Sequence, residues 1–392
     1  MCETICDLTA FNYWRTPPIV RLLACGPEED ELLRNMLDLR RLREFREELA
    51  QENMLVRALR GTDLRRANYG PGTERIKALA CQLAPSTEAP VELLVHEAGK
   101  RRRSKLVHPH VWGHELPPGT TIEVGEGVCV VTPEFALLEL AARTNTTRVA
   151  LLAAELCGGF ACYKPPASVR KVLQELVGSG RLPVHGGWSP ALDQRGRLTT
   201  LWTRPPLCGK DELTSCANGS GSARGRERLL QAAGLVHPGA ASPFEVQAGV
   251  LLGWDPSRGG EGYSGLEHNH RVNLSPQAQR VARRAYCSCD LYWGADGDRA
   301  ALDVECQSAQ HHAGSESALS DADRASALQL EHTNVLGITF RQLTDRKAFE
   351  GVSTLVAERL GREVHVKTAR EERQAEQLRK ELFVDWTSLP CV

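Results

Sequence analysis

The sequence predicts a protein of mixed α/β (α+β) class, and three observations support this prediction. Apolar and polar residues alternate on both sides of the Gly/Asp-rich turn 294–299, which is typical of a strand hairpin. Apolar residues recur every three or four positions over 349–360, which indicates a helix, and the shorter apolar run 335–340 before it indicates a strand. The charge-dense stretch 28–60 shows helical spacing as well. We therefore expect helices and strands to alternate along the chain.

The predicted hairpin carries acidic residues on both strands. Asp290 lies on the first strand, and Asp303 and Glu305 lie on the second. Because strand side chains alternate between faces, pairing of Trp293 near Ala300 would place Asp290 across from Asp303 and diagonal to Glu305. Diagonal side chains lie roughly 7–8 Å apart, a span that one divalent cation can bridge. This pattern favours an oxygen-ligand metal site; the ordinary alternative is a half-buried hairpin with exposed polar positions.

The residues after the hairpin extend it into a compact α/β unit. Ser320 and Asp323 have the spacing of a helix start. Thr344 and Asp345 open the next predicted helix, and Gly361 is its expected end. The predicted order is strand, turn, strand, helix, strand, helix.

Over about residues 240–365 this pattern resembles the Vsr-like branch of the PD-(D/E)xK nuclease superfamily. The resemblance implies a restriction-endonuclease-like fold, with a central mixed sheet flanked by helices, and DNA cleavage that depends on Mg²⁺ or Mn²⁺. On this resemblance Asp290 and Glu305 match the metal-binding acids, and Gln307 takes the place of the superfamily's lysine. The other matched residues are His312 (or His311), which follows the second strand, Asp323 and Arg324 on the next helix, and Glu245 on the first helix.

Gln307 leaves two functional interpretations open. A lysine would orient the attacking water and stabilise the phosphate by its charge, whereas glutamine can only form hydrogen bonds. In an active enzyme, Asp290 and Glu305 would hold the metal, and His312 would donate a proton or bind phosphate. Without activity, the chain would be a non-catalytic DNA-binding or antitoxin-like regulator with a degenerate nuclease fold.

Several of these residues also have purely structural interpretations. Glu245 stands three residues after Ser242 and before an apolar run, which fits a capping box. His311 and His312 follow a strand end, where a solvated loop is the common location. Asp323 and Arg324 could form a local ion pair on their helix, worth a few tenths of a kcal/mol.

A basic run supplies the predicted DNA contact. Lys100, Arg101, Arg102, Arg103 and Lys105 place five positive charges in six positions, which suits phosphate binding or a solvated loop. The net charge of the whole chain is −1, so attraction to DNA must be local.

Residues 106–143 resemble abortive-infection, AbiEi-type antitoxin proteins. In that family the corresponding segment forms strands and the opening of a helix. Here Thr132-Pro133-Glu134 fits a helix start, because it combines a cap with proline at the first helical position. The resemblance rests on 106–110, 116–117, 127–134 and 137–141.

Length and composition bound the remaining expectations. The 392 residues suggest an N-terminal α+β domain over 1–204, a linker over 205–226 and the nuclease-like domain over 227–392. No apolar run approaches the ~20 residues that cross a bilayer, and no secretory signal is evident, so we expect a cytoplasmic protein without membrane contact. The thirteen cysteines are expected to be reduced. A third functional interpretation is a protein-interaction module built on the 28–60 helix.

Overall fold

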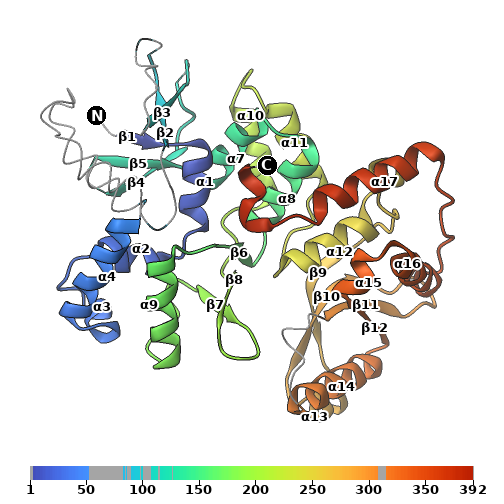
Figure 1. Cartoon of the computed structure of the whole chain (residues 1–392). Helices are drawn as coiled ribbons and strands as arrows, with labels where there is room; N and C mark the ends of the chain where they lie inside the picture. The colour runs from blue at the N-terminus through green and yellow to red at the C-terminus, as the bar shows by residue number, and fades with distance from the viewer. Residues whose placement is uncertain are drawn as a thin grey trace, which may run out of the picture. The chain divides into compact units, whose positions relative to one another are not determined.

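The computed structural model describes residues 3–52, 90–97, 107–113, 115–125, 127–307 and 315–391, and the single positions 83, 85 and 99. These residues form helices and three separate sheets, so the predicted mixed α+β class is confirmed (Figure 1). The chain divides into two compact units. Unit 1 comprises Met1–Leu152, Ala161–Ala233 and Thr387–Val392, and unit 2 comprises Ala153–Phe160 and Gly234–Trp386.

Unit 1 contains a five-stranded mixed sheet with the order β3-β2-β1-β5-β4. Strand β1 pairs antiparallel with β2 and parallel with β5, and β2 pairs parallel with β3. Helices α1 (Asp7–Arg15) and α7 (Pro133–Ala141) pack together beside this sheet. The strands are β1 Glu3–Ile5, β2 Val91–Val95, β3 Val107–Val111, β4 Thr121–Gly125 and β5 Val128–Val131.

A second core of unit 1 joins short helices to a three-stranded sheet of order β6-β8-β7. Its largest buried side chains include Trp202, Phe45 and Met36. The elements of this core are α2 Pro18–Cys25, α3 Glu31–Met36, α4 Leu39–Glu52, α9 Ala167–Gly178, β6 Phe160–Cys162, β7 Ser189–Leu192 and β8 Leu198–Thr203. Three further helices lie outside this core: α8 Thr146–Leu156, α10 Lys210–Gly219 and α11 Arg226–Leu235.

Three expectations for this half need correction. The single helix predicted over 28–60 is interrupted at Leu37, whose backbone is extended, and the carboxylate of Asp38 then accepts a hydrogen bond from the Arg41 amide. An aspartate at that position favours a new helix start, and the apolar spacing alone did not reveal it. The segment expected as a linker contains α10. Cys129 is disulfide-bonded, whereas nine other described cysteines form no disulfide.

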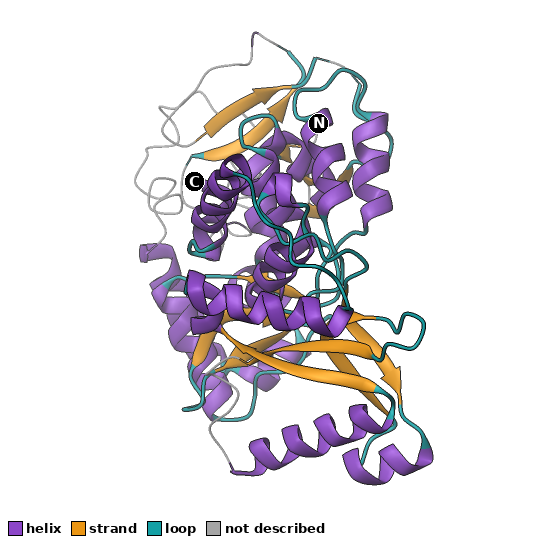
Figure 2. Cartoon of the chain, turned by 90° about the vertical axis from the view of Figure 1, so that its right-hand side faces the viewer, coloured by secondary structure: helices purple, strands orange, loops and turns teal. Residues whose placement is uncertain are grey.

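Unit 2 is built on a four-stranded mixed sheet with the order β12-β11-β10-β9. Strands β9, β10 and β11 pair antiparallel in sequence, and β12 lies parallel to β11. Figures 1 and 2 show this sheet between α12 on one side and α13 and α14 on the other. The elements are α12 Pro243–Gly253, β9 Glu267–Asn273, α13 Pro276–Ala282, β10 Tyr286–Trp293, β11 Ala301–Gln307, α14 Ser315–Leu330, β12 Thr333–Thr339, α15 Phe340–Thr344, α16 Arg346–Leu360 and α17 Ala369–Leu382.

The helix ends of unit 2 mostly follow their sequence signals. The side chain of Asp345 caps α16, and Gly361 ends it with φ of 59°, as predicted. Helix α14, however, begins at Ser315 rather than at Ser320, so the Ser320/Asp323 signal lies inside the helix. Among the described residues, no helix is long and apolar enough to cross a membrane.

Candidate functional site

The predicted hairpin is present, but its register differs from the expected one. Tyr292 pairs with Asp303, and Leu291 pairs with Val304. The prediction that Asp290 lies across from Asp303 is therefore wrong by two residues, because the turn 294–300 takes up more of the chain than we assumed. Asp290 and Glu305 instead lie next to the pair Leu291 and Val304, just beyond the end of the paired part of β10 and β11.

Asp290 is held at this end of the hairpin by the neighbouring strand. Its Oδ2 accepts a hydrogen bond of 2.8 Å from the backbone amide of Cys306. Burial, together with the negative charges of Glu305 and Glu245, raises the pKa of Asp290 to about 8. Burial is the largest cause of this shift, and the two neighbouring carboxylates add to it.

Glu245 approaches the same region from the first turn of α12. Its backbone amide donates to Ser242 Oγ at 3.2 Å, and its carboxylate accepts from Ser242 Oγ at 2.8 Å and from the Ala241 amide at 2.7 Å. The serine cap is therefore confirmed, but the box is not complete, because the Glu245 carboxylate binds the amide of Ala241 rather than that of Ser242. Burial, and to a lesser degree Glu305, raises the pKa of Glu245, so the capping glutamate also faces the acidic site.

Asn269 connects Glu245 to the sheet. Its side-chain amide donates to Glu245 Oε2 at 2.6 Å and to the carbonyl oxygen of Gly239 at 3.0 Å. Its backbone lies in the left-handed region, with φ of 50°, although it belongs to strand β9. Asparagine tolerates that conformation better than most residues, but it remains strained. The sequence analysis did not identify Asn269.

Arg324 of α14 is the cation at the centre of the site. Its guanidinium binds both carboxylate oxygens of Glu305 and the carbonyl oxygen of Ser288, and lies 3.9 Å from Asp303. The predicted local pair of Asp323 with Arg324 is wrong, because Arg324 pairs across elements instead. A planar guanidinium suits such a two-oxygen contact with a carboxylate.

Asp303 is a completely buried carboxyl group next to this pair. Burial and the proximity of Glu305 raise the pKa of Asp303 to about 10, so it is protonated at neutral pH. The site therefore brings together four carboxyl groups and one guanidinium from two helices and two strands. The four acids are Glu245, Asp290, Asp303 and Glu305.

Gln307 lies at the exposed end of β11. A pocket of about 220 Å³ opens beside Gln307, Glu305 and Arg324. On the neighbouring strand β12, Thr339 is the partner of Gln307, and Gly337 is the partner of Glu305. A Cβ added at Gly337 would lie 2.5 Å from Nε2 of Gln307. Glycine at 337 therefore leaves room for the amide. His311, His312 and the basic run 100–105 lie outside the described residues.

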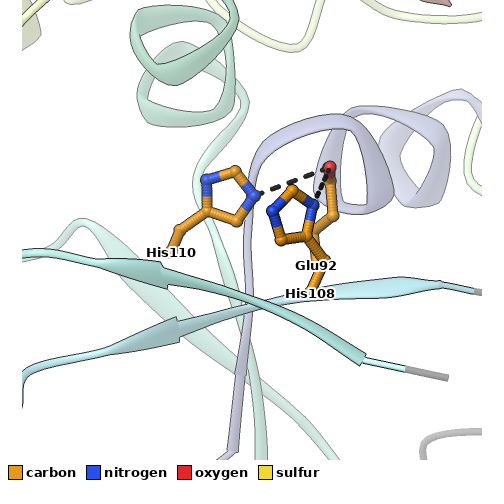
Figure 3. A group of neighbouring side chains, drawn as sticks. All are labelled: Glu92, His108 and His110. Carbon is orange, nitrogen blue, oxygen red and sulfur yellow. Dashed lines mark ion pairs between the residues drawn. The ribbon is translucent and has the colours of Figure 1, made fainter. Parts of the chain in front are cut away.

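A second cluster, which was not predicted from the sequence, lies in unit 1. Glu92 of β2 lies near His108 and His110 of β3, and Figure 3 shows both imidazole rings beside its carboxylate. The signal was present in the sequence as the spacing His-Pro-His on a predicted strand, because alternate strand residues share a face. In the part of the chain that the structure describes, this is the one group of three potential metal-ligand atoms within 4.8 Å of one another.

Comparison with known proteins adds no family to this description. No protein-family model matches the chain, and no match was found among the curated proteins or the solved structures. Functional conclusions therefore depend on the geometry of the two sites.

Proposed function

We propose that unit 2 is a metal-dependent endonuclease domain that hydrolyses phosphodiester bonds in DNA at Glu245, Asp290 and Glu305. The observation that supports this most is the convergence of carboxyl groups from three elements on one place: Glu305 and Glu245 both lie close enough to raise the pKa of Asp290, after the larger effect of burial. The residues come from α12, β10 and β11, as the Vsr-like resemblance implies. Phage defence and DNA repair are the settings in which we would look for such an activity.

The donor set suits a hard divalent cation. Carboxylate oxygens, water and phosphate oxygens are the ligands that Mg²⁺ prefers, and Mn²⁺ accepts them as well. Glu245, Asp290 and Glu305 would hold the ion, which would polarise the phosphate and lower the pKa of a bound water. Their ligand atoms do not all lie within 4.8 Å of one another, so ion binding would draw the carboxylates closer together. A competing cation is already in contact with the site, since Arg324 binds Glu305.

Each residue of the chain has a defined task in this proposal. The Cys306 amide fixes the orientation of Asp290, and Asn269 fixes that of Glu245. Gln307 cannot supply the positive charge that the superfamily's lysine supplies. Arg324 can supply this positive charge. Its guanidinium contacts the carboxylate of Glu305 from the following helix and lies at the edge of the pocket. His312 stays a candidate for proton transfer to the leaving group.

The decisive experiment is cleavage of plasmid and single-stranded DNA by the full chain with Mg²⁺ or Mn²⁺. We expect nicking by the wild type and a loss of at least about 100-fold in Asp290→Asn and Glu305→Gln, the range for removing one essential charge-stabilising group. Glu267→Gln is the matched control, because Glu267 is an exposed acid on β9 of the same sheet. Equal cleavage by all four proteins would indicate a contaminating nuclease and contradict the proposal.

A non-catalytic DNA-binding or antitoxin-like regulator is the second candidate, and the Arg324–Glu305 ion pair favours it. An arginine that occupies both oxygens of Glu305 leaves fewer ligands for a metal. This candidate predicts DNA retention that weakens with salt and no cleavage under any of the metal conditions. Absence of both cleavage and retention would exclude both candidates and leave a protein-interaction role.

A further inference from the structure

We propose that Glu92, His108 and His110 form a binding site in unit 1 for a transition-metal dication of the zinc type. The proposal is independent of the acidic site in unit 2. It rests on the strand register, on the distances between the ligand atoms and on the groups that hold the ligands in place.

The strand register places the three ligands together. In the parallel pair of β2 and β3, Glu92 is the partner of His108, and Leu94 is the partner of His110. His108 and His110 are two residues apart and therefore lie on one face of β3. Both rings approach the carboxylate of Glu92 from that face, as Figure 3 shows.

The distances are close to those of a metal centre. Oε1 of Glu92 lies 3.5 Å from Nε2 of His110 and 3.7 Å from Nδ1 of His108. Tetrahedral coordination with bonds of about 2.0–2.1 Å places ligand atoms about 3.3–3.4 Å apart. Small side-chain rotations would therefore bring the three ligand atoms to the spacing of tetrahedral coordination. The same distances are longer than N–H···O hydrogen bonds of about 2.7–3.2 Å.

The surrounding residues set the orientation and charge of these ligands. Oε2 of Glu92 accepts a hydrogen bond of 2.8 Å from the Leu8 amide, and Oε1 faces the two histidines and Nη1 of Arg143, which lies 3.6 Å away. A bound dication would displace this guanidinium from Oε1. Nδ1 of His110 lies 3.7 Å from Oδ2 of Asp7, which is longer than a hydrogen bond. If the ring shifts toward Asp7 on metal binding, Nδ1 would donate to this carboxylate, an arrangement that fixes a ligating ring and raises its basicity. Asp7 is itself held by Arg143, and its own backbone has φ of 51°.

The donor set determines which metal the site prefers. Two imidazole nitrogens and one carboxylate suit Zn²⁺ and other late first-row dications, whereas Mg²⁺ and Ca²⁺ prefer oxygen ligands alone. Three protein ligands leave one coordination position for water or for an oxygen of a small anionic ligand. Sites of this kind are more typical of catalytic than of structural zinc.

The test is metal titration of the full chain after removal of metals by a chelator. We expect one equivalent of Zn²⁺ to bind by calorimetry and a thousandfold excess of Mg²⁺ to leave this binding unchanged. His108→Ala and His110→Ala should each weaken binding by at least about 10–100-fold, the range seen when metal-site groups are removed. His185→Ala is the control, since this histidine belongs to the same unit but not to the cluster.

Two further measurements separate histidine ligation from thiolate ligation, and lost ligation from lost folding. Co²⁺ bound at the site should lack the near-ultraviolet charge-transfer band of a cobalt–thiolate bond, which would appear if cysteines were the ligands.

Because an alanine variant could fail to fold, His110→Gln provides a milder change that keeps most of the side-chain volume. Zinc should raise the thermal midpoint of the wild type by several degrees and that of His110→Gln by less. Equal zinc affinity in the wild type and the histidine variants, or no zinc binding at all, would overturn the proposal; the cluster would then be an ion-pair network.

Discussion

At the residue scale, the acidic site of unit 2 combines four carboxyl groups with one guanidinium. Such an excess of buried acid is costly, because each carboxylate that ionises loses solvation and meets its neighbours. Asp290 and Asp303 avoid part of this cost by holding protons at neutral pH, with pKa values of about 8 and about 10. Glu305 avoids it by pairing with Arg324.

Replacing Asp290 by asparagine should stabilise the protein at neutral and alkaline pH. The pKa of Asp290 is about 8 when folded and near 3.8 when unfolded. The folded state therefore binds the proton more tightly, and its stability falls as pH rises from about 4 to about 8. Asp290→Asn removes this loss, and we expect a gain of about 1–2 kcal/mol at pH 8, since one pKa unit corresponds to about 1.4 kcal/mol and solvent relaxation reduces the full shift. Urea unfolding at pH 5 and pH 8.5 measures it, with Asp298→Asn in the exposed turn as control. A gain that does not grow with pH would contradict the assignment.

Replacing Arg324 by methionine should destabilise the protein strongly. The substitution keeps much of the side-chain length but leaves Glu305 without its cation, and breaking a buried pair in this way costs about 3–5 kcal/mol. Arg324 is only 19% exposed, so solvent replaces little of the lost contact. Urea unfolding at pH 7 should show the loss.

Arg373→Met is the control for this change, because Arg373 is exposed on α17. If Arg324→Met and Arg373→Met had equal effects, the guanidinium would not be the main support of the acidic site. Added Mn²⁺ should stabilise Arg324→Met more than the wild type, because it no longer competes with the guanidinium for Glu305.

At the element scale, helix α16 contains two glycines with opposite requirements. Gly351 lies in the middle of the helix, and an added Cβ there meets nothing within 4 Å. Gly361 ends the helix with φ of 59°, and an added Cβ would lie 2.0 Å from Cζ of Arg299. Only the second position requires glycine.

Alanine at these two positions should therefore have opposite effects. Gly351→Ala should raise the free energy of unfolding by about 0.5–1 kcal/mol, the usual difference between the two residues inside a helix. Gly361→Ala should lower it by about 1 kcal/mol or more, because alanine is strained in the left-handed region and displaces Arg299. Chemical denaturation of both variants measures these changes in the free energy of unfolding. Changes of the same sign would contradict a helix that ends at Gly361 in the left-handed conformation.

At the scale of the whole molecule, electrostatics restricts how the chain can meet DNA. A net charge of −1 provides no general attraction, so the basic run at 100–105 is the strongest local candidate. Each phosphate contact contributes about 0.9 to the slope of log affinity against log salt for duplex DNA.

Neutralising the five basic residues of this run to glutamine should weaken DNA retention and flatten its salt dependence. We expect the slope to fall by up to about 4.5, because five contacts would be lost. Fluorescence anisotropy with labelled duplex at several salt concentrations measures this. A matched variant that replaces five exposed basic residues of α17 and its surroundings should change the slope less; these are Arg359, Arg362, Arg370, Arg373 and Lys380.

Local pattern allowed much of the fold to be predicted. Alternation identified β10 and β11, the cap and glycine signals defined the ends of α16, and Ser242 with Pro243 marked the start of α12. The failures are also local in origin. The Asp38 cap divided a helix that apolar spacing joined, and the length of the hairpin turn shifted the register by two residues.

The sequence by itself determined the mixed fold class, the starts of α7, α12 and α16 and the fact that Asp290 and Glu305 lie on neighbouring strands, because each depends on residues close together along the chain. Only the tertiary structure decided that Arg324 supplies the charge beside Glu305 and that Asn269 holds Glu245. It alone also brought Glu92 to His108 and His110. These contacts join residues separated by 16 or more positions, and their geometry depends on strand register and helix packing, which alternation and capping signals do not specify.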